Sequence, residues 1–114
     1  GDVDVLSIAA GTNIIGKVSH DKSGIGHGRK TVTTAGTDVA LASTTTAKVV
    51  IITAETDNTG LIAVGGSGVD ATLATRTGTP LSAGDSLTLE IDDLADVYID
   101  ATVSGDGVSF LYLT

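Results

Sequence analysis

The sequence contains no cysteine, no methionine and no tryptophan, and it has one proline and only three aromatic residues. Without cysteine the chain can form no disulfide and can use no thiolate chemistry. With so few aromatic rings, the core must be built from Val, Ile, Leu and Ala. Because the initiator methionine is missing, either it was removed ahead of Gly1 or the sequence is a piece of a longer chain.

Basic residues are also scarce, since six Lys and Arg face fourteen Asp and Glu and the formal net charge is -8. Such a chain is repelled by nucleic acids and by anionic membrane surfaces, so we expect neither as a partner. No apolar run approaches the roughly 20 residues that span a bilayer. The sequence also has no signal-peptide pattern.

The charge is distributed unevenly along the chain. Residues 1–30 hold four basic and three acidic residues, whereas two basic residues face eleven acidic ones from Thr31 onward. This shift predicts an N-terminal arm over residues 1–30 and a domain over residues 31–114. The arm is interpreted either as a flexible linker or as a segment that becomes ordered on a partner, because Ser19–Lys30 is polar and rich in glycine.

Docking by the arm would use its basic residues against an acidic surface and its short apolar pieces against a sheet edge. Backbone hydrogen bonds supply the affinity when a segment adds to such an edge. The candidate partner-binding residues are Val3, Val5, Ile8, Ile14, Ile15, Lys22, Arg29 and Lys30.

The stretch Ala47–Val64 is the strongest structural signal in the domain. Val49–Thr53 is a run of five β-branched residues, which favour a strand. The run is apolar on both faces and predicts a central strand that is covered on both sides. Turn-forming residues and a second apolar run, Leu61–Val64, follow it and predict a β-hairpin.

Further strands are expected with turns between them. Val97–Val103 should carry Asp100 on the face opposite Ile99, and a tight turn at Ser104–Gly107 should pair it with the last strand as a second hairpin. Gly78–Pro80 should break the chain. The other expected segments are strands at Thr31–Thr34, Val39–Ala42, Ser86–Ile91 and Val108–Leu113, a weak strand at Val69–Thr75 and a turn at Asp92–Asp96. This spacing predicts an all-β sandwich, of jelly-roll or immunoglobulin-like type.

Three short motifs resemble catalytic signatures but lack their context. Gly84–Leu87 spells the GDSL signature of a hydrolase family, yet its serine opens an alternating strand and no histidine base follows Lys30. Gly65–Val69 departs from the nucleophile elbow at its last position, and Gly24–Gly28 lacks the flanks of a dinucleotide-binding loop. We interpret both glycine-rich stretches as loops that need positive φ angles, and we expect no enzyme activity.

Two groups of side chains could in principle hold a metal ion. His20 and His27 with Asp21 would suit a transition metal, and the carboxylates of Glu90, Asp92, Asp93 and Asp96 would suit calcium. The acidic spacing fits no twelve-residue calcium loop, and solvated side chains explain both groups. We therefore expect no metal and no cofactor.

Strand-and-turn patterns recur over most of the chain. They lie at Ala9–Val18, Thr37–Ala42, Thr53–Ala54, Asn58–Gly60, Val64–Val69, Pro80–Leu81 and Ile91–Asp100. In these patterns, rather than in catalytic signatures, the chain resembles small β-sandwich virion proteins of tailed bacteriophages.

The resemblance implies a virion protein that is assembled in the host bacterial cytoplasm, foremost a head decoration (cement) protein. Its implied partner is the major capsid protein or another virion protein. Its implied state is a homotrimer, and a monomer that oligomerises only on its scaffold is the alternative. A tail-fibre or head-fibre module is the alternative within this class. A carbohydrate-binding module is the alternative of another class, although Tyr98, Phe110 and Tyr112 lie in expected strands and offer no clear stacking platform.

Overall fold

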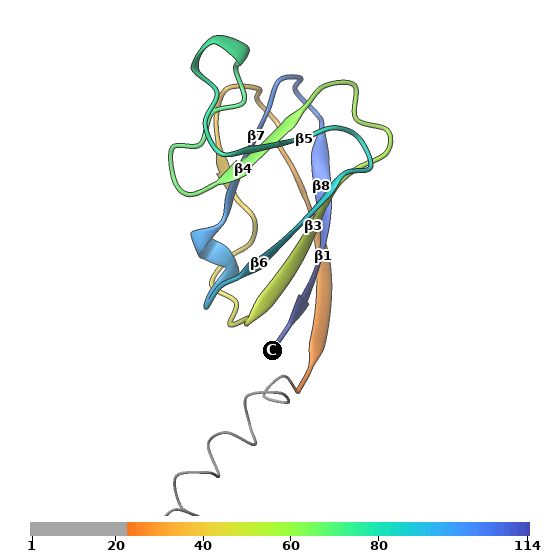
Figure 1. The fold of residues 1–114 in the computed structure, drawn as a ribbon, viewed down its shortest axis with the longest axis vertical. Coiled ribbons are helices and arrows are strands. Elements are labelled where there is room, and N and C mark those ends of the chain that lie inside the picture. The colour runs from red at the N-terminus through yellow and green to blue at the C-terminus, as the bar shows by residue number, and fades with distance from the viewer. Residues whose placement is uncertain (1–22) are drawn as a thin grey trace, which may run out of the picture.

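The computed structural model describes residues 23–114, which form two antiparallel four-stranded sheets (Figure 1). Two single-turn 3-10 helices, η1 (Leu73–Thr75) and η2 (Leu94–Asp96), lie in the connections. Sheet A has the order β1 (Ile25–Thr31), β8 (Gly107–Leu113), β3 (Val49–Ala54), β6 (Ser86–Glu90). Sheet B has the order β2 (Val39–Ala40), β7 (Tyr98–Ala101), β4 (Ile62–Gly65), β5 (Thr79–Leu81). The predicted all-β class is confirmed, and the two sheets are compatible with a β-sandwich.

The strands pair in a nested order along the chain. β1 pairs with β8, β2 with β7, β3 with β6 and β4 with β5. Sheet A is completed by pairing of β3 with β8, and sheet B by pairing of β4 with β7. The chain therefore passes from one sheet to the other at every connection except that between β4 and β5.

Both predicted hairpins are wrong. β3 and β4 lie in different sheets, and so do β7 and β8. The turn residues after Ala54 and at Ser104–Gly107 do reverse the chain, but they carry it across the core instead of back along the same sheet. Local turn chemistry is the same in both cases, so the sequence pattern did not distinguish them.

Two other local expectations are also corrected. Pro80 does not break the chain but lies in β5 opposite Ala63. β5 is an edge strand, where a residue without an N–H group is tolerated. The weak strand expected at Val69–Thr75 is instead part of the long β4–β5 loop, which contains η1.

The core lies between the sheets and takes alternate residues from β3. Val50, Ile52 and Ala54 are buried, whereas Ile51 points to the outer face of sheet A and is only half-buried. The expectation that this strand is covered on both sides is therefore not met by the described residues. The largest fully buried side chains that join Val50 and Ile52 in this core are Val32, Leu41, Ile62, Leu94, Ile99 and Val108.

The outer face of sheet B carries a second, smaller cluster. Ala63, Val69 and Ala71 are buried together, and Tyr98 packs against them. Val69 and Ala71 belong to the β4–β5 loop, so this loop covers that face. The outer face of sheet B is therefore covered by a loop, whereas the outer face of sheet A carries the half-buried side chains of β3.

The predicted boundary at Thr31 is wrong, because residues 25–30 form most of β1. Gly26 and Gly28 lie opposite Tyr112 and Phe110 of β8. A Cβ atom at Gly28 would lie 2.6 Å from the Phe110 Cζ atom, and one at Gly26 would overlap the Tyr112 ring. These glycines make room for aromatic rings and do not supply positive φ angles, whereas Gly68 does have a φ of 91°.

Candidate functional site

The residues that the sequence assigned to partner binding fall into two groups, those outside the described residues and those in β1. Val3, Val5, Ile8, Ile14, Ile15 and Lys22 lie outside the described residues. Arg29 and Lys30 are in β1, where they pair with Ser109 and Val108 of β8. These two basic residues therefore belong to the sandwich and not to an arm.

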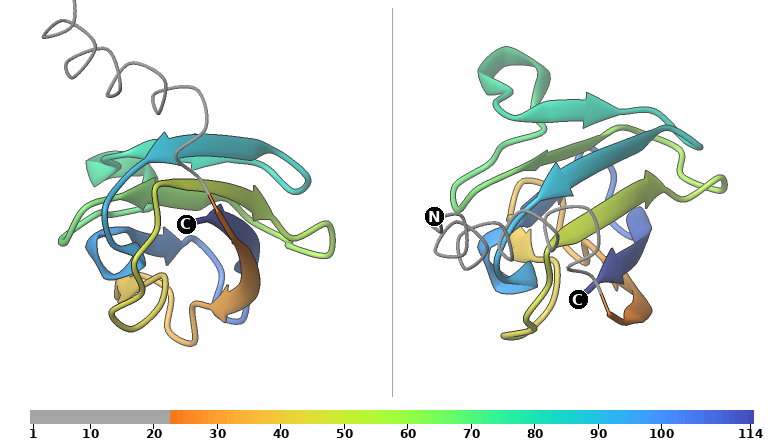
Figure 2. Two further views of the ribbon diagram at one scale, coloured as in Figure 1. Left: turned by 90° about the horizontal axis from the view of Figure 1, so that it is seen from below. Right: turned by 60° about the horizontal axis from the view of Figure 1, so that its bottom comes forward.

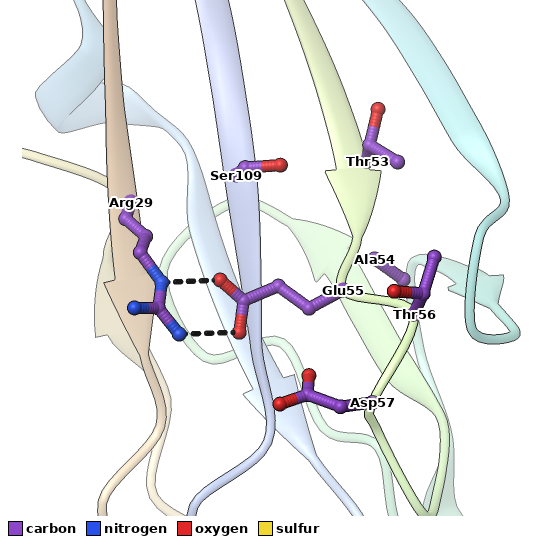
Figure 3. Close-up of a pocket in the computed structure, with 7 residues that line it drawn as sticks. All are labelled: Arg29, Thr53, Ala54, Glu55, Thr56, Asp57 and Ser109. Atoms are coloured by element: carbon purple, nitrogen blue, oxygen red, sulfur yellow. Dashed lines mark hydrogen bonds and ion pairs between the residues drawn. The ribbon is translucent and has the colours of Figure 1, made fainter.

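Arg29 is held by a bidentate ion pair with Glu55 (Figure 3). Its Nε atom lies 2.5 Å from Glu55 Oε2, and its Nη2 atom lies 3.0 Å from Oε1. The hydrogen bond to Glu55 raises the pKa of Arg29, and the negative charges of Glu55 and Asp57 add to this. The pair joins the edge strand β1 to the residue that follows β3, which gives Arg29 a structural role.

An open depression of about 410 Å³ lies beside this ion pair. Figure 3 shows its lining, which includes the carboxylate of Asp57 and the hydroxyl groups of Thr53, Thr56 and Ser109. These groups offer hydrogen bonds to a polar ligand. The guanidinium at its edge is already bound to Glu55, so the depression is not an open site for an anion.

A different surface lies at the other end of sheet A and is apolar. Ile25, Leu113 and Val49 form one cross-strand row on the outer face, and Leu111 and Ile51 belong to the next row. Ile25 is 69% exposed and Leu111 is 37% exposed, whereas the other three are half-buried. We call these five residues the apolar patch.

Two carboxylates, those of Asp100 and Asp106, are buried and hold loops. Asp100 is 0% exposed and accepts hydrogen bonds from the N–H groups of Gly36 at 3.0 Å and Ala71 at 2.8 Å. Asp106 accepts from the N–H groups of Thr59 and Gly60. An acidic residue between Ile99 and Ala101 was the one available signal, and the β4–β5 loop that buries it is a tertiary feature.

The serine of the GDSL motif contacts a threonine hydroxyl, whereas a catalytic serine needs a histidine base. Ser86 opens β6, and its hydroxyl lies 2.9 Å from the Thr53 hydroxyl on β3. Gly84 has a φ of 86°, and Asp85 accepts a hydrogen bond from the Ser82 N–H group. The motif therefore builds the tight turn that leads into β6.

One of the acidic residues considered for calcium, Asp93, binds backbone N–H groups. Asp93 Oδ1 accepts hydrogen bonds from the N–H groups of Thr45 and Ala95, both at 2.9 Å, and caps η2. These two bonds lower the pKa of Asp93. Among residues 23–114, no group of three or more His, Cys, Asp or Glu side chains is placed to hold a metal ion. His20 and Asp21 of the other candidate group lie outside this range.

The aromatic side chains all take part in packing. Phe110 is buried, and its ring lies 6.2 Å from that of Tyr112, measured between centroids. Tyr112 packs against the main core, and Tyr98 packs against the small cluster of sheet B. None of the three rings is fully exposed, so little ring surface is free for a sugar to stack on.

Acidification is expected to remove the stabilisation that Asp93 provides. Because the folded state lowers the pKa of this carboxyl, its contribution is present above the ordinary value of 3.8 and is lost as the pH falls through the lower folded value. Asp93→Asn keeps one acceptor oxygen but cannot titrate. We expect the urea midpoint of the parent protein to approach that of the variant as the pH falls below 3.8. The exposed neighbour supplies the control Asp92→Asn, and an equal convergence for both variants would contradict this role.

Comparisons of the chain with protein-family models, curated proteins and solved structures found no match. No helix among residues 23–114 is long and apolar enough to cross a membrane.

Proposed function

We propose that this protein is a structural component of tailed-bacteriophage virions, most specifically a head decoration protein that binds and stabilises the capsid. The resemblance of its strand-and-turn patterns to such proteins supports the virion class. The nested pairing of eight strands supports a jelly roll over an immunoglobulin-like sandwich. Jelly rolls occur in viral capsid domains but also in lectins, so the fold alone does not decide the function.

The proposal rests on three features that lie together at one end of the molecule. They are the C-terminus, the start of the described chain at Ser23 and the apolar patch. Seen from below in Figure 2, the C-terminus lies beside β1. The backbone N–H group of Ser23 bonds to the carbonyl of Thr114 at 2.6 Å, so residues 1–22 join the domain at that point. The apolar patch begins at Ile25, two residues further on. The N-terminal segment therefore leaves the sandwich at one end, which is the arrangement that end-on attachment through its apolar piece Val3–Ile8 requires.

Attachment of this kind stabilises a capsid by mass action. A protein that binds the assembled shell, and not its free subunits, shifts the equilibrium towards the shell. The partner is the major capsid protein or another virion protein, and the protein resides in the virion after assembly in the host bacterial cytoplasm. The resemblance further implies a homotrimer.

Deletion of residues 1–22 is expected to abolish or strongly reduce binding to undecorated capsids. The deletion ends before β1, because the removal of residues 25–30 would take away an edge strand of sheet A. Electron cryomicroscopy of capsids incubated with each protein measures the occupancy, and circular dichroism checks the fold.

The matched control is Leu73→Ser, which changes a side chain that is 80% exposed on η1. η1 lies at the opposite end of the molecule from the C-terminus (Figure 1), so this variant should decorate capsids fully. Full occupancy by the truncated protein would contradict attachment through the N-terminal segment. Binding to fibres and not to heads would instead support the fibre-module alternative.

A further inference from the structure

The apolar patch lies on the outer face of sheet A, across β1, β8 and β3. Two of the four large hydrophobic side chains that are exposed among residues 23–114 belong to it, Ile25 and Leu111. The equivalent side of sheet B is covered by the β4–β5 loop, through Val69 and Ala71. Within the described part of the chain, no such loop covers the patch.

Polar residues surround the patch on the same face. Ser109 lies beyond Leu111 on β8, Thr88 and Glu90 flank it on β6, and His27 flanks it on β1. All four are exposed. An apolar surface with a polar rim is typical of a site that another segment or protein covers.

The chain itself supplies a segment of matching chemistry. Residues 1–22 join the domain at Ser23, two positions before Ile25. Ile14, Ile15 and Val18 place three aliphatic side chains within five residues. Residues 19–22, which lie between this segment and Ser23, can span up to about 14 Å, which is enough for the chain to reverse over the face of β1.

The patch is small compared with the length that this linker can span. Its two rows are two residues apart along the strands, or about 7 Å. A segment tethered this closely has an effective concentration on the order of millimolar, so a modest apolar contact suffices to hold it in place.

We propose that Ile14–Val18 pack on the apolar patch of the same chain and close the outer face of sheet A. The segment then covers the outer face of sheet A, as the β4–β5 loop covers the outer face of sheet B. The more distant apolar piece, Val3–Ile8, remains available for a partner. This inference does not depend on a role in a virion, and its test uses the isolated full-length protein.

The test measures how accessible the patch is to a thiol reagent. The chain has no cysteine, so Leu111→Cys introduces a single thiol within the patch. We expect its reaction with a maleimide to become about tenfold faster when Ile14, Ile15 and Val18 are all replaced by serine, because protection by a docked segment is lost. Replacement of Val3, Val5 and Ile8 by serine removes the same number of aliphatic side chains and should leave the rate unchanged.

Two controls separate protection of the patch from a general change in the fold. Ser109→Cys lies on the same strand outside the patch and should react at one rate in all three backgrounds. In a second control, the double variant with Ile15→Cys and Leu111→Cys should form an intrachain disulfide on oxidation. This variant should then run as a monomer in a denaturing gel.

Three outcomes would overturn the proposal. The L111C thiol could react equally fast in all backgrounds. Its protection could depend on protein concentration, or the disulfide could join two chains, and either result would make a second copy the occupant of the patch. Because no capsid is involved, such a failure would leave the proposed function to be judged by its own experiment.

Discussion

Replacement of Asp100 by alanine is expected to reduce the free energy of unfolding by about 1–3 kcal/mol, the cost of one buried N–H donor left unpaired, because one of its two backbone donors is buried and the other is only part-buried. The donors belong to Gly36, in the β1–β2 connection, and Ala71, in the β4–β5 loop. Asp100 is on β7 in sheet B, so its carboxylate joins two loops to the outer face of that sheet. Urea unfolding of the parent and the variant measures the loss.

The control for Asp100 is Asp38→Ala. Asp38 also accepts a backbone hydrogen bond, from the Gly68 N–H group at 2.9 Å, but it is partly exposed and water can replace it. We therefore expect a clearly smaller loss for this variant. Similar losses for the two variants would mean that water also reaches the space left by Asp100 and that the carboxylate is not the main support of the two loops.

Replacement of Ile52 by alanine is expected to cost about 2–5 kcal/mol, the range for deletion of a large aliphatic side chain from a packed core. Ile52 is 0% exposed and belongs to the cluster between the sheets. Equilibrium unfolding in urea, with equal slopes for parent and variant, measures this difference directly.

The neighbouring residue provides a control with the same chemistry. Ile51→Ala removes the same atoms from the next position of β3, but that side chain is half-buried on the outer face of sheet A. Its loss is expected to be smaller, because the side chain does not lie in the closed core. Equal losses for Ile51→Ala and Ile52→Ala would contradict the assignment of the inner and outer faces of β3.

The fold class and most strand positions could be predicted from local patterns. β-branched residues predicted β3, alternation predicted β6, and the acidic turn predicted the reversal that contains η2. These features depend on side chains within a few positions of each other. The propensity of the backbone is therefore enough to find them.

The candidate site was predicted less well, for reasons that specific residues illustrate. Arg29 was expected in a free arm because of its charge, but its ion-pair partner Glu55 is 26 positions away. The apolar patch combines residues of three strands, which are adjacent only after β1 and β3 have both paired with β8. Neither feature can be recognised from residues that lie close together in the sequence.

The sequence by itself determined that this chain forms strands, where many of its turns lie and that its core is aliphatic, because these properties follow from the conformational preferences and hydrophobicity of neighbouring residues. Only the tertiary structure decided which strands pair. The turn before β8 is compatible with a hairpin, yet β8 pairs with β1 and β3, and β7 pairs with β2 and β4. The physical reason is that a turn reverses the chain in either case, whereas the choice of partner depends on which apolar faces bury each other across the whole domain. The same burial placed Asp100 inside and left Ile25 on the surface.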